Sequence, residues 1–183
     1  LQQASERHEI DWQWVKGHAG HPYNERADRL AVAQITRPVD DGNYEVAIFV
    51  AASCDAAAGV GAGGALVQMG EHEHLYSGKV TNTTANQLYI LGVFEGLRLL
   101  PLNLITRVFT NSDYLYKGVT EWLAGWQKNG WQTRERQPVK NAANWQALAA
   151  QLELRHVTFA LQTTPDDRLA QAQQAAENQR KSA

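Results

Sequence analysis

The side chains with the clearest chemical potential stand near the start of the chain. His18 and His21 lie in the stretch 17–23 (GHAGHPY), and Asp28 follows within NERADRLA. An imidazole can exchange a proton near neutral pH, and a carboxylate is a preferred ligand of hard cations such as Mg²⁺. These residue types therefore point to acid–base or metal chemistry wherever the fold brings them together.

The elements around these residues must determine their positions. Trp12 and Trp14 alternate in the manner of a half-buried strand, and the glycine-punctuated residues 17–23 are typical of a loop. Residues 24–35 show the apolar spacing of a helix, so Asp28 is expected in its first turns. The pattern predicts a strand, a histidine-bearing loop and a helix.

This stretch resembles the final strand, mobile loop and last helix of type I ribonuclease H, through its run WVKGHAGHPYNERADRLA. The resemblance implies that His18 and Asp28 belong to an active site in which Asp28 binds Mg²⁺ or Mn²⁺. In that family the element ends the domain, whereas here it begins the chain. We therefore expect residues 1–36 to be the C-terminal remnant of an upstream ribonuclease H domain.

Length and composition suit this interpretation. The 183 residues match one domain of about 100–150 residues together with such a remnant. The net charge of −2 excludes a global electrostatic footprint for nucleic acid, so any polyanion site must be local. The single cysteine, Cys54, excludes an internal disulfide, and no apolar run approaches the roughly 20 residues of a membrane span. We expect a cytoplasmic protein without membrane contact.

The remaining chain reads as a linker followed by one patterned domain. Pro, Gly and Asp gather in TRPVDDGN, so a linker is predicted at 37–43 and a domain at 44–180. Strands are expected at 44–52, 65–69, 72–80, 105–110 and 154–160, with a Gly- and Ala-rich turn at 56–64. Helices are expected at 84–100, 112–127, 142–152 and 165–180, the last with Pro165 near its first turn.

This order of elements is that of the ribonuclease H-like α/β fold. The resemblance implies a five-stranded mixed sheet flanked by helices, preceded here by the orphan strand, loop and helix. The most specific likeness lies in residues 109–133 (FTNSDYLYKGVTEWLAGWQKNGWQT) and 138–148 (PVKNAANWQAL). DRLA occurs at 28–31 and again at 167–170, which indicates the back part of a tandem ribonuclease H protein.

The family's catalytic carboxylates are mostly replaced. Its hydrolysis is two-metal catalysis, which needs several carboxylates converging on Mg²⁺. By alignment of the motifs, the four carboxylate positions fall on Ala51, Tyr89, Asn111 and Asp167. The loop LQTTP before the last helix also has no counterpart of His18. We expect a degenerate copy without a bound metal, in which the nearby acids are ordinary turn or surface residues: Asp55, Glu95 and Asp113.

Aromatic and basic residues interleave between Glu121 and Lys140. From Gln127 to Lys140 there are four bases and one acid, a local charge of +3. The segment resembles the basic handle with which the family's cellular enzymes hold the DNA strand of a hybrid, and such contacts are independent of base sequence and sensitive to salt. The resemblance implies nucleic-acid contacts at Thr84, Asn86, Lys128, Trp131, Arg134, Arg136 and Lys140.

A packing interpretation stands beside the binding one. Tryptophans on the expected helices are interpreted as core residues: Trp122, Trp126 and Trp145. For three residues the sequence leaves open whether they contact nucleic acid or belong to the core and its solvated rim: Trp131, Arg134 and Arg136.

Two functions follow from these observations. In the first, the parent protein is a hydrolase, an endonuclease that cleaves RNA in RNA/DNA hybrids with Mg²⁺ in its upstream domain, and residues 44–180 bind hybrid without cleaving it. In the second, residues 44–180 are a structural or dimerisation module without nucleic-acid binding. A homodimer, or a domain swap in which residues 1–36 dock on the second sheet, stays open. The 183-residue chain is expected to be inactive under either function.

Overall fold

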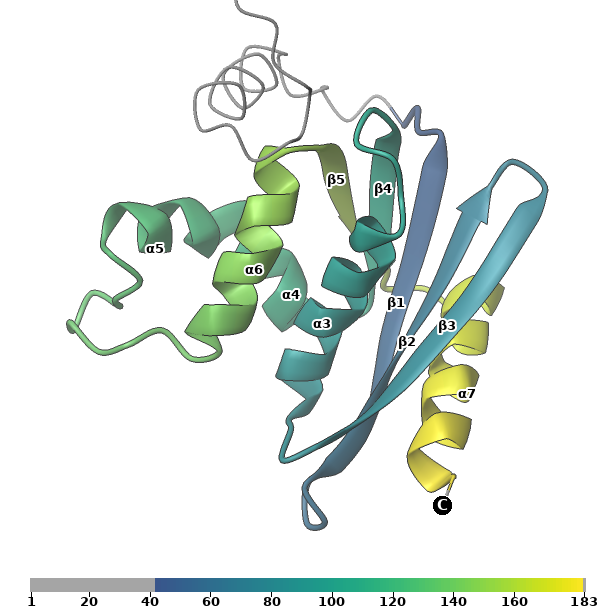
Figure 1. Ribbon diagram of the computed structural model, residues 1–183, viewed down its shortest axis with the longest axis horizontal. Helices are drawn as coiled ribbons and strands as arrows, with labels where there is room; N and C mark the ends of the chain where they lie inside the picture. Colours follow the sequence, from purple (N-terminus) through teal and green to yellow (C-terminus); the bar gives the residue numbers. More distant parts are fainter. Residues whose placement is uncertain (1–41, 183) are drawn as a thin grey trace, which may run out of the picture. The chain divides into compact units, whose positions relative to one another are not determined.

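The computed structural model describes residues 42–182, in which five strands form one mixed sheet (Figure 1). The strands are β1 (Val46–Asp55), β2 (Val60–Met69), β3 (His72–Thr81), β4 (Ile105–Thr110) and β5 (His156–Leu161). Their order across the sheet is β3-β2-β1-β4-β5. Neighbours among β1, β2 and β3 pair antiparallel, whereas β1, β4 and β5 run parallel. The predicted five-stranded mixed sheet is confirmed.

Part of the sequence interpretation lies outside the described residues. This holds for the strand, loop and helix predicted at the start of the chain, with His18 and Asp28, and for most of the linker predicted at 37–43. Within residues 42–182, no helix has the length and apolar character needed to cross a membrane.

Helices cover both faces of the sheet. On one face α7 (Asp167–Lys181) crosses β1, β2 and β3. On the other face lie α3 (Ala85–Arg98), α4 (Asp113–Lys117) and α6 (Ala142–Glu153), and α5 (Leu123–Lys128) extends beyond the sheet (Figure 1). The central strand β1 is almost wholly buried because it supplies residues to a core on each face. Ile48 and Val50 belong to the larger core, and Phe49 and Ala51 to the smaller core beneath α7.

Side-chain caps explain where the helices begin. The Thr84 hydroxyl accepts a hydrogen bond from the Gln87 N–H at 3.3 Å, which starts α3 at the predicted place. At the last helix the cap is Asp166, so α7 begins at Asp167 and Pro165 lies just before its first turn. A capping oxygen satisfies N–H groups that have no partner within the helix, and this fixes the first residue of each element.

The helix predicted at 112–127 divides into α4, a π-helical turn and α5. The π-helical turn spans Gly118–Trp122. A Cβ on Gly118 would lie 2.2 Å from a ring atom of the fully buried Trp145. The glycine therefore allows this indole to pack directly against the backbone of the turn.

The Gly- and Ala-rich turn predicted at 56–64 is wrong. The turn is confined to residues 56–59, and β2 already begins at Val60. A Cβ on Gly64 would lie 2.1 Å from the carbonyl oxygen of Ala172 in α7. This glycine is therefore needed for the close approach of α7 to β2. In the sequence, glycines of this kind cannot be distinguished from those of a turn.

β3, which corresponds to the strand predicted at 72–80, is exposed over nearly its whole length. Only Val80 among its residues is partly buried. The strand lies at the edge of the sheet and pairs with β2 alone within the described residues. His72 and His74 are accordingly exposed residues of this strand.

Candidate functional site

Tyr89 and Asn111 meet near the carboxyl end of β4. Tyr89 lies in α3, and Asn111 directly follows β4. The Tyr89 hydroxyl donates a hydrogen bond of 2.8 Å to the side-chain oxygen of Asn111. Burial raises the pKa of Tyr89, and the N–H of Ala52 offsets this shift only in part. The phenol therefore stays protonated at neutral pH and acts as the donor.

Ala51 bounds the same region within the sheet. It immediately precedes Ala52, whose N–H faces the Tyr89 hydroxyl. The Ala51 side chain is fully buried and packs in the smaller core with Phe49 and Leu66. A buried methyl group offers no ligand atom, so this position contributes nothing to cation binding.

The fourth aligned position, Asp167, is the exposed first residue of α7. The helix cap is the preceding Asp166, whose carboxylate accepts hydrogen bonds from the N–H groups of Arg168 at 2.9 Å and Leu169 at 3.2 Å. Partial burial raises the pKa of Asp166, but these bonds and the Arg168 guanidinium outweigh it, so the pKa lies below its usual value. Asp167 adds a negative charge to the first turn, where the helix dipole favours it.

A guanidinium lies at this end of α7, and the sequence interpretation missed it. Arg168 donates hydrogen bonds to Gln68 at 3.1 Å and to Asp166 at 3.2 Å, and its carbon lies 4.4 Å from the centre of the Phe49 ring. Phe49 stands two residues before Ala51 on the same face of β1. The Arg168 guanidinium thus lies over the same face of the sheet as the Ala51 side chain. The only sequence signal was the position of Arg168 inside the repeated DRLA.

The side chains at these four positions do not fit a two-metal centre. They include one carboxylate, and the amide oxygen of Asn111 already accepts a hydrogen bond from Tyr89. Within residues 42–182, no group of three or more His, Cys, Asp or Glu side chains is placed to hold a metal ion. Mg²⁺ is bound through several hard oxygen ligands in near-octahedral geometry, and carboxylates supply the charge. A metal site would need several carboxylates that converge on one point. At this place the structure has the hydrogen bond between Tyr89 and Asn111.

The acids nearest to the aligned positions have structural contacts of their own. Asp55 accepts hydrogen bonds at 3.1 Å from the N–H groups of Ala57 and Ala58, which close the β1–β2 turn. Glu95 accepts a hydrogen bond of 2.8 Å from Arg98 one turn along α3. These contacts agree with the prediction that both residues are turn or surface acids.

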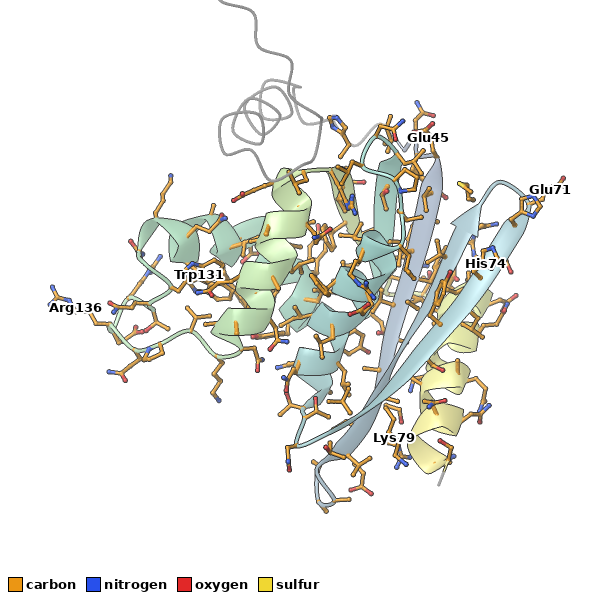
Figure 2. All side chains as sticks on the ribbon, viewed as in Figure 1. Glu45, Glu71, His74, Lys79, Trp131 and Arg136 are labelled. Atoms are coloured by element: carbon orange, nitrogen blue, oxygen red, sulfur yellow. The ribbon has the colours of Figure 1, made fainter. Side chains whose placement is uncertain are left out.

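A closed loop between α5 and α6 carries most of the basic residues. The Thr133 N–H donates to the Gln137 carbonyl at 2.8 Å, and the Arg136 N–H donates to the Thr133 carbonyl at 3.0 Å. We call residues 127–140 the handle. All its bases are exposed, and Figure 2 shows Arg136 projecting from its tip. They are Lys128, Arg134, Arg136 and Lys140. The cross-bonded loop therefore holds three solvent-facing cations on a defined backbone, and the fourth, Lys128, ends α5.

Trp131 belongs to the packed side of the same loop. Its ring is partly buried against the larger core and lies toward α6 (Figure 2). Its N–H donates to the Trp126 carbonyl at 2.7 Å, and its own carbonyl accepts from the Val139 N–H at 3.1 Å. Trp131 therefore anchors the loop to the helices, and of the two interpretations left open for it the structure supports packing.

The helical tryptophans form one aromatic cluster, as interpreted from the sequence. Trp126 lies 5.6 Å from Trp122 and 5.5 Å from Trp145, measured between ring centres. The Trp145 indole N–H donates to the Tyr114 hydroxyl at 3.0 Å. Because Trp145 is fully buried, this partner satisfies a donor that would otherwise be costly.

The other predicted contact residues lie at the start of α3. Thr84 and Asn86 are both exposed there. Next to them, the Gln87 amide donates a hydrogen bond of 3.3 Å to the Asn144 side-chain oxygen in the first turn of α6. This bond, which the sequence did not indicate, links the start of α3 to the helix that follows the handle. The first turns of α3 and α6 are thus joined next to the predicted contact residues.

The sheet order and the helices on its two faces define the ribonuclease H-like fold. Comparison with solved structures agrees, at low sequence identity. The crystal structure of LC9-RNase H1, a type 1 RNase H with the type 2 active-site motif, has a TM-score of 0.65 and 20% identity, covering 78% of this chain and 74% of that one. The foamy viral protease-reverse transcriptase in complex with RNA/DNA hybrid has a TM-score of 0.63 and 17% identity, covering 81% of this chain and 22% of that one.

Sequence comparison then identifies the family. The sequence model of the family described as RNase H matches residues 1–36 and 43–163. Ribonuclease H of Bordetella pertussis is 39% identical over 115 residues, which cover 63% of this chain and 74% of that protein. The chain belongs to the ribonuclease H family.

Proposed function

We propose that residues 44–180 bind RNA/DNA hybrid without cleaving it, as a degenerate copy of a ribonuclease H domain. In this proposal His18 and Asp28 belong to the catalytic site of another ribonuclease H domain, which uses Mg²⁺ or Mn²⁺ to hydrolyse the RNA strand. The match of the family model in two separate stretches, 1–36 and 43–163, supports the tandem arrangement.

The observation that carries the proposal is the contrast between two regions of the same domain. Where the family has carboxylates, Tyr89 and Asn111 are hydrogen-bonded to each other and Ala51 is a buried methyl group. The handle, by comparison, keeps its cations exposed on a cross-bonded loop. Loss of the catalytic ligands together with retention of the basic surface is the pattern expected of a domain that holds a polyanion.

Charge supports a local, phosphate-directed mode of binding. The handle bears +3 between Gln127 and Lys140, although the chain as a whole bears −2. Cations that neutralise phosphates release counterions, so binding of this kind weakens steeply with salt. The foamy viral protein with the same fold was solved with an RNA/DNA hybrid, which makes hybrid the first substrate to test.

The second candidate is a structural or dimerisation module without nucleic-acid binding. The exposed strand β3 favours it, because it is an edge strand of the sheet that the structure describes, and an edge left unpaired is available to another chain. The two candidates use different surfaces, so one experiment can separate them.

The experiment measures binding of the 183-residue chain to a labelled RNA/DNA hybrid, with duplex DNA as competitor and Mg²⁺ present. Hybrid-preferring binding without cleavage is the expected result. A variant with Arg134 and Arg136 both changed to Gln should bind at least about 10-fold more weakly at low salt. The matched control changes Lys117 and Lys181 to Gln, two exposed bases outside the handle, and should bind like the unmodified chain.

Two outcomes would contradict the proposal. Absence of binding at low salt would remove the nucleic-acid function and leave the structural module. Cleavage of the hybrid that persists after Tyr89→Phe and Asp167→Asn substitution would show that catalytic ligands lie elsewhere in the chain.

A further inference from the structure

Among residues 42–182, the edge strand β3 pairs only with β2, and it carries exposed apolar side chains. Leu75 is 51% exposed and Tyr76 is 40% exposed, two of the few large apolar residues at the surface. The strand borders a groove on each face of the sheet. The groove beside α3, of about 470 Å³, is lined by Tyr76, Gly78 and Leu99 among others, and the one beside α7 by Leu75 and Ser77. Such an edge is suited to pairing with another strand.

We infer that β3 pairs antiparallel with β3 of a second copy of this chain, about a twofold axis at Tyr76. In this register Glu73 of each copy lies opposite Lys79 of the other. Leu75 of each copy lies opposite Ser77 of the other, and the two Tyr76 residues face each other. The inference concerns a surface separate from the handle and does not rest on the function proposed above.

Backbone geometry limits the possible registers. In an antiparallel pair, two opposite residues either both direct their N–H and C=O groups to the partner strand or both direct them away. Alternate residues of β3 already direct these groups to β2. A twofold axis must therefore pass through a residue and cannot pass between two residues.

Charge then selects one register among those allowed. With an axis at Glu73, the Glu73 carboxylates of the two copies would lie opposite each other. With an axis at Leu75 or Ser77, Glu73 of one copy would not lie opposite Lys79 of the other. Only an axis at Tyr76 makes both ion pairs within β3, one at each end of the contact. The Lys79 ammonium already donates one hydrogen bond to the Ser182 carbonyl, and its other two N–H groups serve the pair with Glu73. Opposite charges directly across an antiparallel pair are stabilising and like charges are destabilising.

The two faces of the paired strands also fit. Tyr76, Gly78 and Val80 oppose β2 residues of the larger-core face, so they lie on the α3 side. A Cβ on Gly78 would meet nothing within 4 Å, which leaves room for the opposite His74 and the neighbouring Tyr76 of the second copy. Tyr76 of the second copy could then cover the groove beside Leu99. Figure 2 shows His74 and Lys79 at separate ends of the open strand.

The test uses charge reversal in the 183-residue chain, with sedimentation velocity over a concentration series. Glu73→Lys and Lys79→Glu should each raise the dimer dissociation constant at least about 10-fold, because each homodimer opposes like charges twice. An equimolar mixture of the two variants should restore association, since every pair in the heterodimer is again Glu with Lys. The double variant E73K/K79E should also associate like the unmodified chain.

Matched controls separate specific pairing from general charge attraction. Lys117→Glu and Glu121→Lys change exposed residues away from β3 by the same charges. Each should self-associate like the unmodified chain, and their mixture should show no gain. Thermal unfolding of all variants confirms that they are folded, which is expected because both substituted residues of β3 are exposed.

Three results would overturn the inference. A chain that stays monomeric at roughly 0.5 mM does not pair through β3. Self-association that survives both single reversals uses another surface. Single reversals that abolish association without rescue in the mixture would exclude the register at Tyr76.

Discussion

The close approach of α7 to β2 makes Gly64→Ala the sharpest test of the fold around the aligned site. An added Cβ would lie 2.1 Å from the Ala172 carbonyl oxygen and 3.0 Å from the carbonyl carbon. Non-bonded carbon contacts normally lie near 3.5–4.0 Å, so helix and strand must separate by roughly 1 Å or more. The obstructing atoms belong to the helix backbone, which cannot rotate away as a side chain could.

The expected cost follows from that geometry. Overpacking of a core costs about 1–3 kcal/mol, and a clash with backbone belongs at the upper end. Replacing glycine by alanine within a strand returns about 0.5–1 kcal/mol of conformational free energy. We expect a net loss of about 2 kcal/mol in the free energy of unfolding, measured by urea denaturation at micromolar concentration.

Gly78→Ala is the matched control. Gly78 is also a strand glycine, but a Cβ there would meet nothing within 4 Å. The control should be neutral or stabilised by about 0.5 kcal/mol. A loss of less than about 0.5 kcal/mol in the free energy of unfolding of Gly64→Ala would show that α7 does not lie against β2 as described. The position of Arg168 over Phe49 would then be wrong as well.

Three further predictions address the site and the handle. Tyr89→Phe removes the hydrogen bond to Asn111, which is exposed and can bind water instead, so urea denaturation should show a loss of only about 1 kcal/mol. Asp166→Ala removes the cap of α7 and should cost about 1 kcal/mol at pH 7. Because the pKa of Asp166 is depressed in the folded chain, that difference should be complete above the usual Asp pKa of about 3.9 and shrink as pH falls below it, in unfolding measured across pH. Changing Arg134 and Arg136 to Gln should reduce the slope of log affinity against log salt by about 1.5–2, and an unchanged slope would exclude these residues from phosphate contact.

Local patterns in the sequence were enough to predict most elements. The strand expected at 105–110 has those bounds in the structure, because its apolar residues are flanked by clear turn residues. The apolar spacing that predicted a helix at 84–100 corresponds to α3, whose cap is Thr84. These elements depend on neighbours in the chain, and so their signals are local.

The features that escaped prediction depend on contacts between distant segments. β2 has a glycine at position 64 because α7, more than 100 residues later, packs directly on it. The residues next to Gly64 in the sequence give no sign of that contact. The Tyr89–Asn111 hydrogen bond joins α3 to the end of β4. Motif alignment named both residues as replaced carboxylates, but only the structure shows that the replacements bond to each other. The exposure of β3 likewise follows from its place at the edge, which its composition does not reveal.

The two proposed surfaces have a joint consequence for binding. A twofold axis that continues one sheet into another runs perpendicular to the sheet, so α3 and the handle of both copies would lie on the same side. In Figure 1, β3 and α5 lie at opposite ends of the domain, which would leave the two handles at the outer ends of the dimer. A hybrid long enough to reach both handles should then bind more tightly than a short one, through effective concentration.

This consequence can be measured as the ratio of affinities for a long and a short hybrid, because the ratio cancels any direct effect of a charge change. For the unmodified chain we expect a ratio at least about 10-fold above that expected from length alone. Glu73→Lys and Lys79→Glu should each remove the excess, and their equimolar mixture should restore it. If the single variants kept the full ratio while sedimentation showed them to be monomers, the handles of two paired copies would not act on one hybrid, and binding and pairing would be independent properties of the domain.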